Sequence, residues 1–583
     1  MSSIEHIRHS FAHLLAAAIE EIYPGAKNTI GPAVDNGFYY DFEFPKGSAP
    51  SDKDFTKIEN EMRKILKTWK GFEGAEVSEA EAKARFADNP YKLELIDEIV
   101  KKDEKITLYT SGTFTDLCRG GHAEIVDMKP DAFKLARVAG AYWRGDEKNT
   151  MLTRIYSLAF ASKEELEAYE KMMEEAKKRD HRVLGKELEL FTFSSIVGAG
   201  LPIWLPKGAT VRRVLERFIV DTELEWGYLH VNTPDIAKLE LYKKSGHYPY
   251  YKESMYAPIE IDKEEFMLRP MTCPHHFQVF SDSPKTYKDL PMRIAELAKL
   301  YRYEASGELT GLMRVRGFCL ADAHIICADP EQAKSEVGKA LDLIEYVANV
   351  FGLKQGSEYT YRLSLGDRKD EKKYYKNDVA WDMSEKILKE VLVERNCVFI
   401  EVHNEAAFYG PKIDIQMKDV RGKENTAFTV QYDFCMPDRF DLEYTAKDGS
   451  KQRPIVVHRS SIGAIERVMA FLIEHYAGNF PLWLSPVQVK VIPVRDNHNA
   501  VAIAAAQALR DAGLRVDLDT SDTGFGKKVR EAKDMKTPYS IIIGDKDIEA
   551  NVVTLESRDH GKVGQMTIGE VVKKLSEEKL SKK

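Results

Sequence analysis

The sequence predicts a multidomain protein of mixed α+β and α/β class, and three observations support this prediction. The chain has 583 residues, 43% of them hydrophobic, which is enough for about three or four domains that each bury a core. A strongly charged helical segment at 164–182 is typical of a connector between domains. Beyond residue 484 strands alternate with helices, which indicates an α/β layer.

The first half of the chain contains three recognisable helices. Apolar residues recur at helical spacing from Ile4 to Ile22, and Tyr23-Pro24-Gly25 ends that helix. The segment 164–182 has few large apolar residues, so we place the first domain boundary near residue 183. A third, amphipathic helix opens at Pro206 and is followed by a short strand that ends at Pro234.

The C-terminal region shows the clearest alternation. We expect strands at 487–494, 514–518 and 539–544, with an alanine-rich helix at 500–512 that Gly513 ends. Between these elements and the third helix, strands and helices are interleaved, and the order of strands in the sheet does not follow from the pattern.

Composition narrows the class of protein. Lys and Arg number 85 against 93 Asp and Glu, a net charge of −8, which argues against a generally basic nucleic-acid coat but leaves room for a local basic surface. The six cysteines are scattered, which is typical of reduced thiols. We find no secretory signal and no apolar run long enough for a membrane span, so we expect a cytoplasmic protein.

Two half-sites of metal-ligating residues lie in the first domain. His9 and His13 are four residues apart on the first helix, and Cys118 and His122 flank a tight glycine turn. Their spacing matches a metal centre with four ligands. Surface histidines on a helix with an unrelated cysteine are an equally weighted alternative.

A hairpin with arginines is predicted in the middle region. The runs 300–304 and 311–318 flank a polar loop, which suggests antiparallel strands. Arg302 and Arg314 could bind a triphosphate there, although arginine and glutamate pairs on strands are more often solvated partners. No phosphate-binding glycine loop of the GxxxxGK[ST] type and no dinucleotide fingerprint occurs, so a nucleotide would need another scaffold.

Motifs along the whole chain resemble those of threonyl-tRNA synthetases. In the first domain these are His9-Ser-Phe-Ala-His13, Asp116–His122 and Ala139–Asp146. Further on, the matching segments are Met271–Pro274, Arg302–Glu304, Gly311–Phe318, Asp322–His324, Phe408–Ile413, His458–Arg459 and Glu466–Arg467. The sequence is therefore identified as a member of this family of class II ligases, in its bacterial form.

The resemblance implies a domain plan. Residues 1–183 correspond to an editing domain with its connecting helix, 184–483 to a class II catalytic domain built on an antiparallel sheet, and 484–583 to an α/β anticodon-binding domain. The ubiquitin-like domain that usually precedes the editing domain is expected to be missing. The helix and strand that end at Pro234 resemble motif 1, which implies a homodimer.

The family's reaction is ATP-dependent ligation of L-threonine to tRNA(Thr) through threonyl-adenylate. The resemblance places Arg302 and Arg467 as catalytic residues and assigns Glu304, Arg314 and Phe318 to ATP, with Mg²⁺ on the phosphates. No spacing rule unites Cys273, His324 and His458, but by resemblance they bind one zinc ion per chain. Asp322, Tyr409 and Gln431 would line the threonine pocket.

Serine shares the hydroxyl group of threonine, so the resemblance also implies hydrolytic editing of seryl-tRNA(Thr). The residues expected to edit are His9, His13, Lys92, Asp116, Cys118 and His122, and we favour a site without metal. A stand-alone seryl-tRNA deacylase and a non-catalytic RNA-binding paralogue are the alternatives. Both are disfavoured because the residues for activation are all present.

Two residues depart from the family pattern. Gly121 replaces a frequent proline in the turn between Cys118 and His122, which should loosen that turn. Leu320 replaces a usual glutamine beside the amino-acid pocket, which removes one polar contact.

Overall fold

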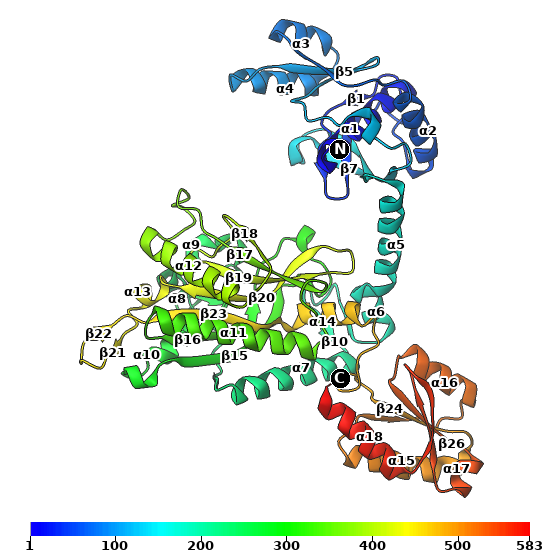
Figure 1. The fold of residues 1–583 in the computed structure, drawn as a ribbon, viewed down its shortest axis with the longest axis vertical. Helices are drawn as coiled ribbons and strands as arrows, with labels where there is room; N and C mark the ends of the chain where they lie inside the picture. The colour runs from blue at the N-terminus through cyan, green and yellow to red at the C-terminus, as the bar shows by residue number, and fades with distance from the viewer. Residues whose placement is uncertain (1, 583) are drawn as a thin grey trace. The chain divides into compact units, whose positions relative to one another are not determined.

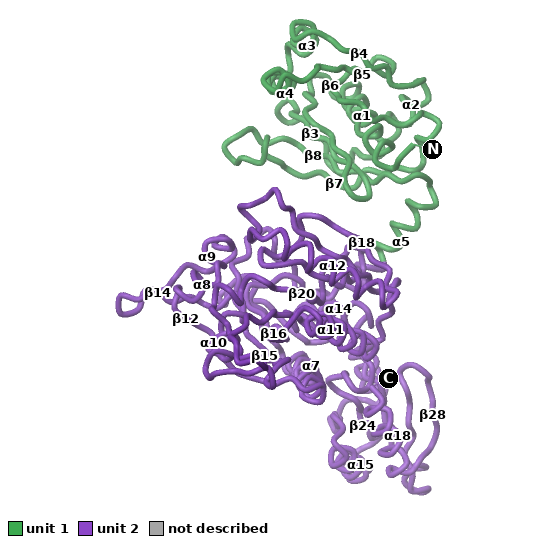
Figure 2. Tube along the Cα trace, turned by 60° about the vertical axis from the view of Figure 1, so that its left-hand side comes forward, with its two compact units in different colours: residues 1–174 green, residues 175–583 purple. Residues whose placement is uncertain are grey.

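The computed structural model describes residues 2–582. Contacts divide the chain into two compact units, residues 1–174 and 175–583 (Figure 2). The first unit and the second are each built around their own buried apolar cores. The predicted domain ranges 1–183, 184–483 and 484–583 stay predictions.

The predicted first helix is confirmed as α1 (Ile4–Ile22), and its residues 10–19 are buried on all sides. The helix packs on a five-stranded sheet of order β1-β3-β8-β7, with β2 beside β3. The strands are β1 (Lys27–Asn28), β2 (Ala33–Val34), β3 (Gly37–Glu43), β7 (Phe133–Tyr142) and β8 (Met151–Ala159). This packing fixes the middle of α1, which carries His9 and His13.

A smaller layer completes the first unit. It contains helices α3 (Glu79–Arg85) and α4 (Pro90–Lys101) and the antiparallel strands β4 (Glu73–Glu76), β5 (Thr107–Ser111) and β6 (Phe114–Leu117). The Asn89 side chain caps α4 by accepting from the backbone N–H groups of Tyr91 and Lys92. Helix α4 thereby presents Lys92 toward Asp116 on β6.

The predicted connector is helical, but the prediction of one continuous helix is wrong. Helix α5 (Lys163–Arg179) ends before Asp180, and α6 (His181–Glu187) follows. The Asp180 carboxylate accepts from the backbone N–H of Arg182, which makes Asp180 the N-cap of the second helix. An N-cap has non-helical backbone angles, so the chain is interrupted there.

The second unit is organised around an eight-stranded sheet of order β11-β15-β16-β23-β20-β19-β17-β18 (Figure 1). Its pairings are antiparallel except at the two ends, where β11 and β18 are parallel to their neighbours. The strands are β11 (Leu229–His230), β15 (Met292–Tyr301), β16 (Gly317–Cys327), β17 (Tyr359–Ser364), β18 (Phe399–Val402), β19 (Lys412–Lys418), β20 (Glu424–Asp433) and β23 (Ile455–Ala464). The predicted antiparallel catalytic sheet is confirmed.

Helices cover this sheet through two separate cores. The larger core combines strand side chains with those of α7 (Pro206–Glu225), α11 (Pro330–Val350), α12 (Asp378–Glu394) and α14 (Ile465–His475). A second core involves α10 (Cys273–Ser281) and α13 (Met436–Phe440). Alternate residues of β16, from Cys319 to Cys327, enter the larger core, so the intervening residues point to the other face of the sheet.

The predicted hairpin is confirmed in its pairing but not in its extent. Strands β15 and β16 are antiparallel, with Leu300 opposite Phe318. The strands end at Tyr301 and restart at Gly317, so Arg302 and Arg314 lie in the connecting loop and not on the strands. The strand expected to end at Pro234 is shorter, since β11 ends at His230.

The predicted C-terminal α/β layer is confirmed. A five-stranded sheet has the order β25-β24-β26-β27-β28, and its first three strands are parallel. The predicted elements correspond to β24 (Val489–Pro493), α15 (Asn499–Asp511), β25 (Val516–Leu518) and β26 (Tyr539–Ile543), followed by β27 (Val553–Ser557), β28 (Gly561–Met566) and α18 (Ile568–Ser581). Among residues 2–582, none of the helices has the length and apolar character that a membrane crossing requires.

Candidate functional site

A cavity of about 590 Å³ lies over the eight-stranded sheet. Leu320, Asp322 and His324 line it from β16, because residues two apart on a strand share one face. The residues between them, such as Ala321 and Ala323, are buried in the larger core. Leu320 lies in the wall between Phe318 and Asp322 and opposite Ala464 of the neighbouring strand.

Three potential metal ligands that are distant in sequence meet at one end of the cavity. His324 on β16 lies directly opposite His458 on β23, and Cys273 begins helix α10. Their ligand atoms all lie within 4.8 Å of one another, and all three residues are buried. This is a donor set that a borderline-soft ion such as zinc accepts.

Each of the two histidines uses one ring nitrogen for a contact outside this set. His324 Nδ1 lies 2.8 Å from His276 Nδ1, and His458 Nε2 lies 2.7 Å from an oxygen of Asp433. One nitrogen of each ring therefore remains for a metal, and its partner fixes the orientation of the ring. Burial, with Asp322 and Asp433 nearby, raises the pKa of the Cys273 thiol above its ordinary value, so a thiolate here requires a cation.

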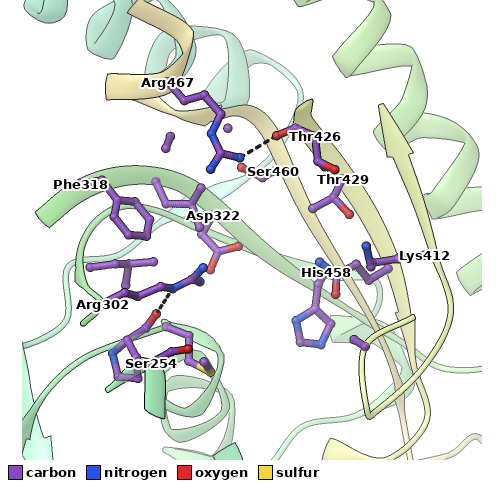
Figure 3. A pocket seen from close by; sticks show the side chains of 18 of the residues that line it. Ser254, Arg302, Phe318, Asp322, Lys412, Thr426, Thr429, His458, Ser460 and Arg467 are labelled. Carbon is purple, nitrogen blue, oxygen red and sulfur yellow. Dashed lines mark hydrogen bonds between the residues drawn. The ribbon is translucent and has the colours of Figure 1, made fainter. Parts of the chain in front are cut away.

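Polar side chains surround the three ligands. The hydroxyl of Tyr409 donates to the amide oxygen of Gln431 at 2.6 Å, and the Tyr409 ring stacks on His458. Asp322 accepts a hydrogen bond from the hydroxyl of Thr272, and burial raises the pKa of its carboxyl. Figure 3 shows Asp322 and His458 projecting into the same cavity. The pocket can therefore recognise a small polar ligand beside the metal set.

Arginines gather at the other end of the cavity. Arg302 follows β15 and donates from Nε to the carbonyl of Pro270 at 3.2 Å, with its guanidinium 5.2 Å from the centre of the Phe318 ring. Arg467 on α14 donates to the carbonyls of Met313 at 3.1 Å and Thr426 at 2.7 Å (Figure 3). Burial and the nearby cations lower the pKa of Arg467. Because Arg302 and Arg467 bring two positive charges close together, this end of the cavity favours the binding of a polyanion.

The remaining predicted nucleotide residues are already paired with each other. Glu304 accepts from Arg314 Nε at 2.8 Å, and Arg314 also contacts Glu308 at 3.0 Å. A ligand that uses Glu304 or Arg314 must therefore replace this ion pair. The structure thus brings all the sequence-predicted residues of the second unit into one cavity.

The sequence analysis missed several residues around this cavity. Thr272 contacts Asp322, and His276 bridges His324 to Glu296 through contacts of 2.8 and 3.3 Å. Lys412 lines the cavity and pairs with Asp414 at 2.5 Å. The only sequence signal for His276 was its place three residues after Cys273.

The four His and Cys residues of the first unit also converge. His9 Nε2 lies 3.1 Å from Cys118 Sγ and 3.3 Å from His13 Nε2, while His122 Nε2 lies 3.5 Å from Cys118 Sγ. His9, His13 and Cys118 line a cavity of about 560 Å³, together with Lys92 and Asp116. All six predicted residues of this site are thus neighbours.

The side chains of His13, His122 and Cys118 are neutral at neutral pH. Burial lowers the pKa of His13 to about 3 and that of His122 to about 4. Burial likewise raises the pKa of the Cys118 thiol to about 11. The site can therefore orient a water molecule or a polar ligand through neutral hydrogen-bonding groups.

A buried ion pair lies beneath these neutral groups. Lys92 Nζ contacts Asp116 at 2.5 Å, and Tyr40, which the sequence analysis missed, donates to Asp116 at 2.6 Å. Burial alone raises the pKa of Asp116, but Lys92, His13 and Tyr40 outweigh it and leave the pKa below its ordinary value. The pair fixes β6 beside α4 and positions the start of the segment that carries Cys118.

The turn that contains the first family departure has an unusual backbone. Gly120 and Gly121 have φ values of 92° and 84°. Proline, whose φ is close to −65°, cannot adopt such an angle. The turn in this chain therefore depends on glycine at position 121.

Comparisons with known proteins agree with this geometry. Residues 256–476 match the family model of the tRNA synthetase class II core domain (G, H, P, S and T), and residues 488–578 match the anticodon binding domain. The threonine–tRNA ligases of Staphylococcus carnosus and Geobacillus kaustophilus are each 48% identical, over 97% of this chain and 86% of theirs. A crystal structure of the RNA binding domain of threonyl-tRNA synthetase from Cryptosporidium parvum matches with a TM-score of 0.64 and 35% identity, over 68% of this chain and 98% of that one.

Replacing Lys92 with Met should leave the Asp116 carboxylate buried without its cation. We expect the first unit to lose about 3–5 kcal/mol of stability at pH 7, the usual cost of breaking a buried pair. Because the folded-state pKa of Asp116 is lowered, its ionic stabilisation is present above the unfolded pKa of about 4 and is lost as pH falls through the folded pKa. Hydrogen exchange of β6 at pH 7 and at a pH well below 4 measures both effects.

Lys105→Met is the matched control, because Lys105 pairs with Glu76 at 2.7 Å on the exposed surface. Its effect should stay below about 1 kcal/mol. Equal effects of the two substitutions, or a Lys92→Met effect that does not shrink at low pH, would contradict this account.

Proposed function

The chain belongs to the threonine–tRNA ligase family, and we propose that it joins L-threonine to tRNA(Thr) in two steps. A carboxylate oxygen of threonine attacks the α-phosphorus of ATP, the bond to the bridging oxygen breaks, and threonyl-adenylate and pyrophosphate form. A ribose hydroxyl at the 3′ end of the tRNA then attacks the carbonyl carbon, and AMP leaves. The observation that carries the proposal is one cavity with a Cys-His-His set at one end and three arginines at the other.

Arg302 and Arg467 are the proposed catalytic residues. Arg302 binds the α-phosphate and the threonine carboxylate, and Arg467 neutralises charge on the departing pyrophosphate. Hydrogen bonds to backbone carbonyls hold both guanidinium groups in place before ATP arrives. Little reorganisation is then needed as charge develops, which is the main source of catalysis in such sites.

Glu304, Phe318 and Arg314 complete the ATP site. Phe318 stacks on adenine, Glu304 accepts from its amino group, and Arg314 binds the phosphate tail together with Mg²⁺. Arg314 and Glu304 must separate to do so, because they are paired in the structure. ATP binding therefore exchanges an internal ion pair for contacts to the nucleotide.

Cys273, His324 and His458 are proposed to hold one zinc ion per chain. When bound, zinc supplies a Lewis acid for the amino and hydroxyl groups of threonine. Asp322 accepts from the threonine hydroxyl, while Tyr409 and Gln431 close the pocket around it. Valine lacks the hydroxyl, and a site that needs this group rejects such an analogue far more strongly than an apolar pocket does.

The first unit is proposed to hydrolyse seryl-tRNA(Thr). Serine has the same hydroxyl group as threonine and lacks only its methyl group. The threonine pocket can therefore discriminate against serine by only about 10–200-fold. His9, His13, Cys118 and His122 position the ester and a water molecule, above the Lys92–Asp116 pair. The neutral state of His13 and His122 supports a role in orienting water through hydrogen bonds, and the site is proposed to need no metal.

The proposed partners are tRNA(Thr) and a second copy of the chain, in the cytoplasm. Residues 488–578, which match the anticodon-binding family, are proposed to read the anticodon loop, where unpaired bases expose their edges. Six free cysteines fit a reducing compartment.

Cys273→Ser should abolish both zinc binding and threonine activation. We expect purified protein to contain one zinc per chain by elemental analysis, and the variant to contain far less. Threonine-dependent ATP–pyrophosphate exchange should fall by about 100-fold or more, since several kcal/mol of Lewis-acid stabilisation are lost. Cys397→Ser, at a half-buried site away from the cavity, should keep both properties. Full exchange activity in a zinc-free variant would overturn the assignment.

His9→Ala should slow hydrolysis of seryl-tRNA(Thr) by about 100-fold while threonine-dependent exchange stays unchanged. His6→Ala, an exposed neighbour on the same helix, is the matched control and should hydrolyse normally. Because the pKa values of His13 and His122 are about 3 and 4, hydrolysis should not lose activity through their protonation between pH 6 and 8. Normal deacylation by the His9 variant would contradict the proposed site.

The homodimer is proposed to form through α7 and the edge strand β11. Leu224 and Leu229 lie there with 52% and 54% of their surface exposed. Analytical ultracentrifugation should give a molecular mass twice the 66.3 kDa of one chain, and Leu229→Asp should lower this mass toward that of the monomer. Ile259→Asp, an exposed change on strand β13 (Ile259–Ile261), should leave the mass unchanged. A monomeric parent protein would rule out this interface.

A further inference from the structure

A histidine outside the cavity joins helix α6, helix α14 and the loop between β15 and β16. The His181 ring is buried at the start of α6. Its Nδ1 lies 2.6 Å from a carboxylate oxygen of Glu474, near the end of α14. Its Nε2 accepts from the backbone N–H of Leu312 at 3.1 Å.

These two contacts define the proton position on the ring. A backbone N–H can only donate, so Nε2 of His181 must be the unprotonated nitrogen. Nδ1 then carries the hydrogen and donates it to Glu474. Glu474 is itself held by backbone N–H groups of His181 and Val420, both at 3.4 Å. The carboxylate therefore fixes the tautomer and the direction of the ring, as carboxylates do for functional histidines.

The same contacts argue against a metal at this place. Oxygen and nitrogen atoms of Asp180, His181 and Glu474 lie within 4.8 Å of one another, which resembles a ligand set. Both ring nitrogens of His181 are already used, one as donor and one as acceptor. No lone pair of the ring remains for an ion, so the cluster is a hydrogen-bonded relay.

The backbone N–H that donates this hydrogen bond to His181 lies in a tight turn. Thr310 and Arg314 exchange backbone hydrogen bonds of 3.2 and 3.3 Å, which closes the turn around Gly311, Leu312 and Met313. Gly311 has φ +48°, and a Cβ placed on it would lie 2.2 Å from His181 Nε2. Glycine is thus required for the ring to approach the turn so closely.

The turn connects directly to the residues assigned to ATP. The carbonyl of Met313 accepts from Nε of Arg467 at 3.1 Å, and Arg314 closes the turn. Leu312 directly precedes Met313 and Arg314 in the chain. A displacement of Leu312 therefore moves the support of one arginine and the backbone of the other.

We propose that His181 is a positioning residue for ATP: through the Leu312 N–H it holds the 310–314 turn in the conformation that places Arg314 and Arg467. Glu474 serves by keeping the acceptor nitrogen of His181 directed at the turn. This inference rests on the proposed function, because it assumes that the arginines bind the triphosphate. His181 does not line the cavity, so the proposal gives a residue of the connector region an indirect role in nucleotide binding.

Two amide substitutions separate this role from simple packing. In His181→Gln the amide oxygen can reach the position of Nε2 and accept from Leu312. In His181→Asn the shorter amide can reach only the position of Nδ1, so it can donate to Glu474 but leaves the Leu312 N–H unpaired. Both variants carry a side-chain amide, and the glutamine side chain is one methylene group longer than the asparagine side chain.

The measurements are the dissociation constant of ATP·Mg²⁺ by calorimetry and the KM values for ATP and threonine in pyrophosphate exchange. His181→Asn should weaken ATP binding and raise its KM by about tenfold, as expected for one unsatisfied buried donor. His181→Gln should stay within about threefold of the parent protein, and the KM for threonine should change little in either variant. Hydrogen exchange at 310–314 should be faster only in His181→Asn.

Equal ATP affinities in the two variants, whether both normal or both weakened, would overturn the proposal. If His181→Asn fails to fold, the pair Glu474→Gln and Glu474→Leu tests the same relay. Gln keeps an acceptor for Nδ1–H and should bind ATP normally, whereas Leu should weaken it. A parent protein that binds ATP but shows no threonine-dependent exchange would refute the proposed function, while the binding comparison would still decide the role of His181.

Discussion

The pairing of β16 with β23 is the constraint on which the candidate active site depends. This register places His324 opposite His458, and the alternation of β16 places Asp322 on the same face. A shift of one residue would turn each of these side chains into the apolar core. The odd-numbered neighbours Ala321 and Ala323 are fully buried there, so core packing opposes such a shift. The alternating apolar residues of β16 therefore indirectly determine the positions of the candidate metal ligands His324 and His458.

Prediction from sequence succeeded where the signal was local. The helix at Ile4–Ile22 and the C-terminal strands follow from periodicity and from turn residues such as Gly513. It failed where one side-chain contact decides the backbone, as at Asp180, whose capping bond divides the connector into two helices. Arg302 and Arg314 were expected on strands but lie in a loop, because the β15–β16 ladder ends before reaching them.

The candidate sites show the same division. The i, i+4 spacing of His9 and His13 predicted a shared direction, and the structure brings them together. Nothing in spacing joins Cys273 with His324 and His458, because strand pairings between distant segments create that cluster; only the family resemblance proposed it. Tyr40 and His181 were missed altogether. Each acts through a partner far away in sequence, so no local pattern marks it.

The two cavities differ in the charge of the side chains that are proposed to contact the reacting groups. Threonine activation brings a carboxylate to a triphosphate, so the reactants repel each other until cations compensate. Arg302, Arg314 and Arg467 are proposed to provide that compensation, and the burial of Arg467 near the other two cations is costly, as its lowered pKa indicates. Hydrolysis of a neutral ester needs no such field. In the first unit, uncharged His13 and His122 lie above the buried Lys92–Asp116 pair, while Lys102, Lys105 and Arg119 line the same cavity as cations. In the proposed hydrolysis these cations would bind phosphates of the RNA backbone and position the substrate, whereas the uncharged histidines and thiol would contact the ester itself.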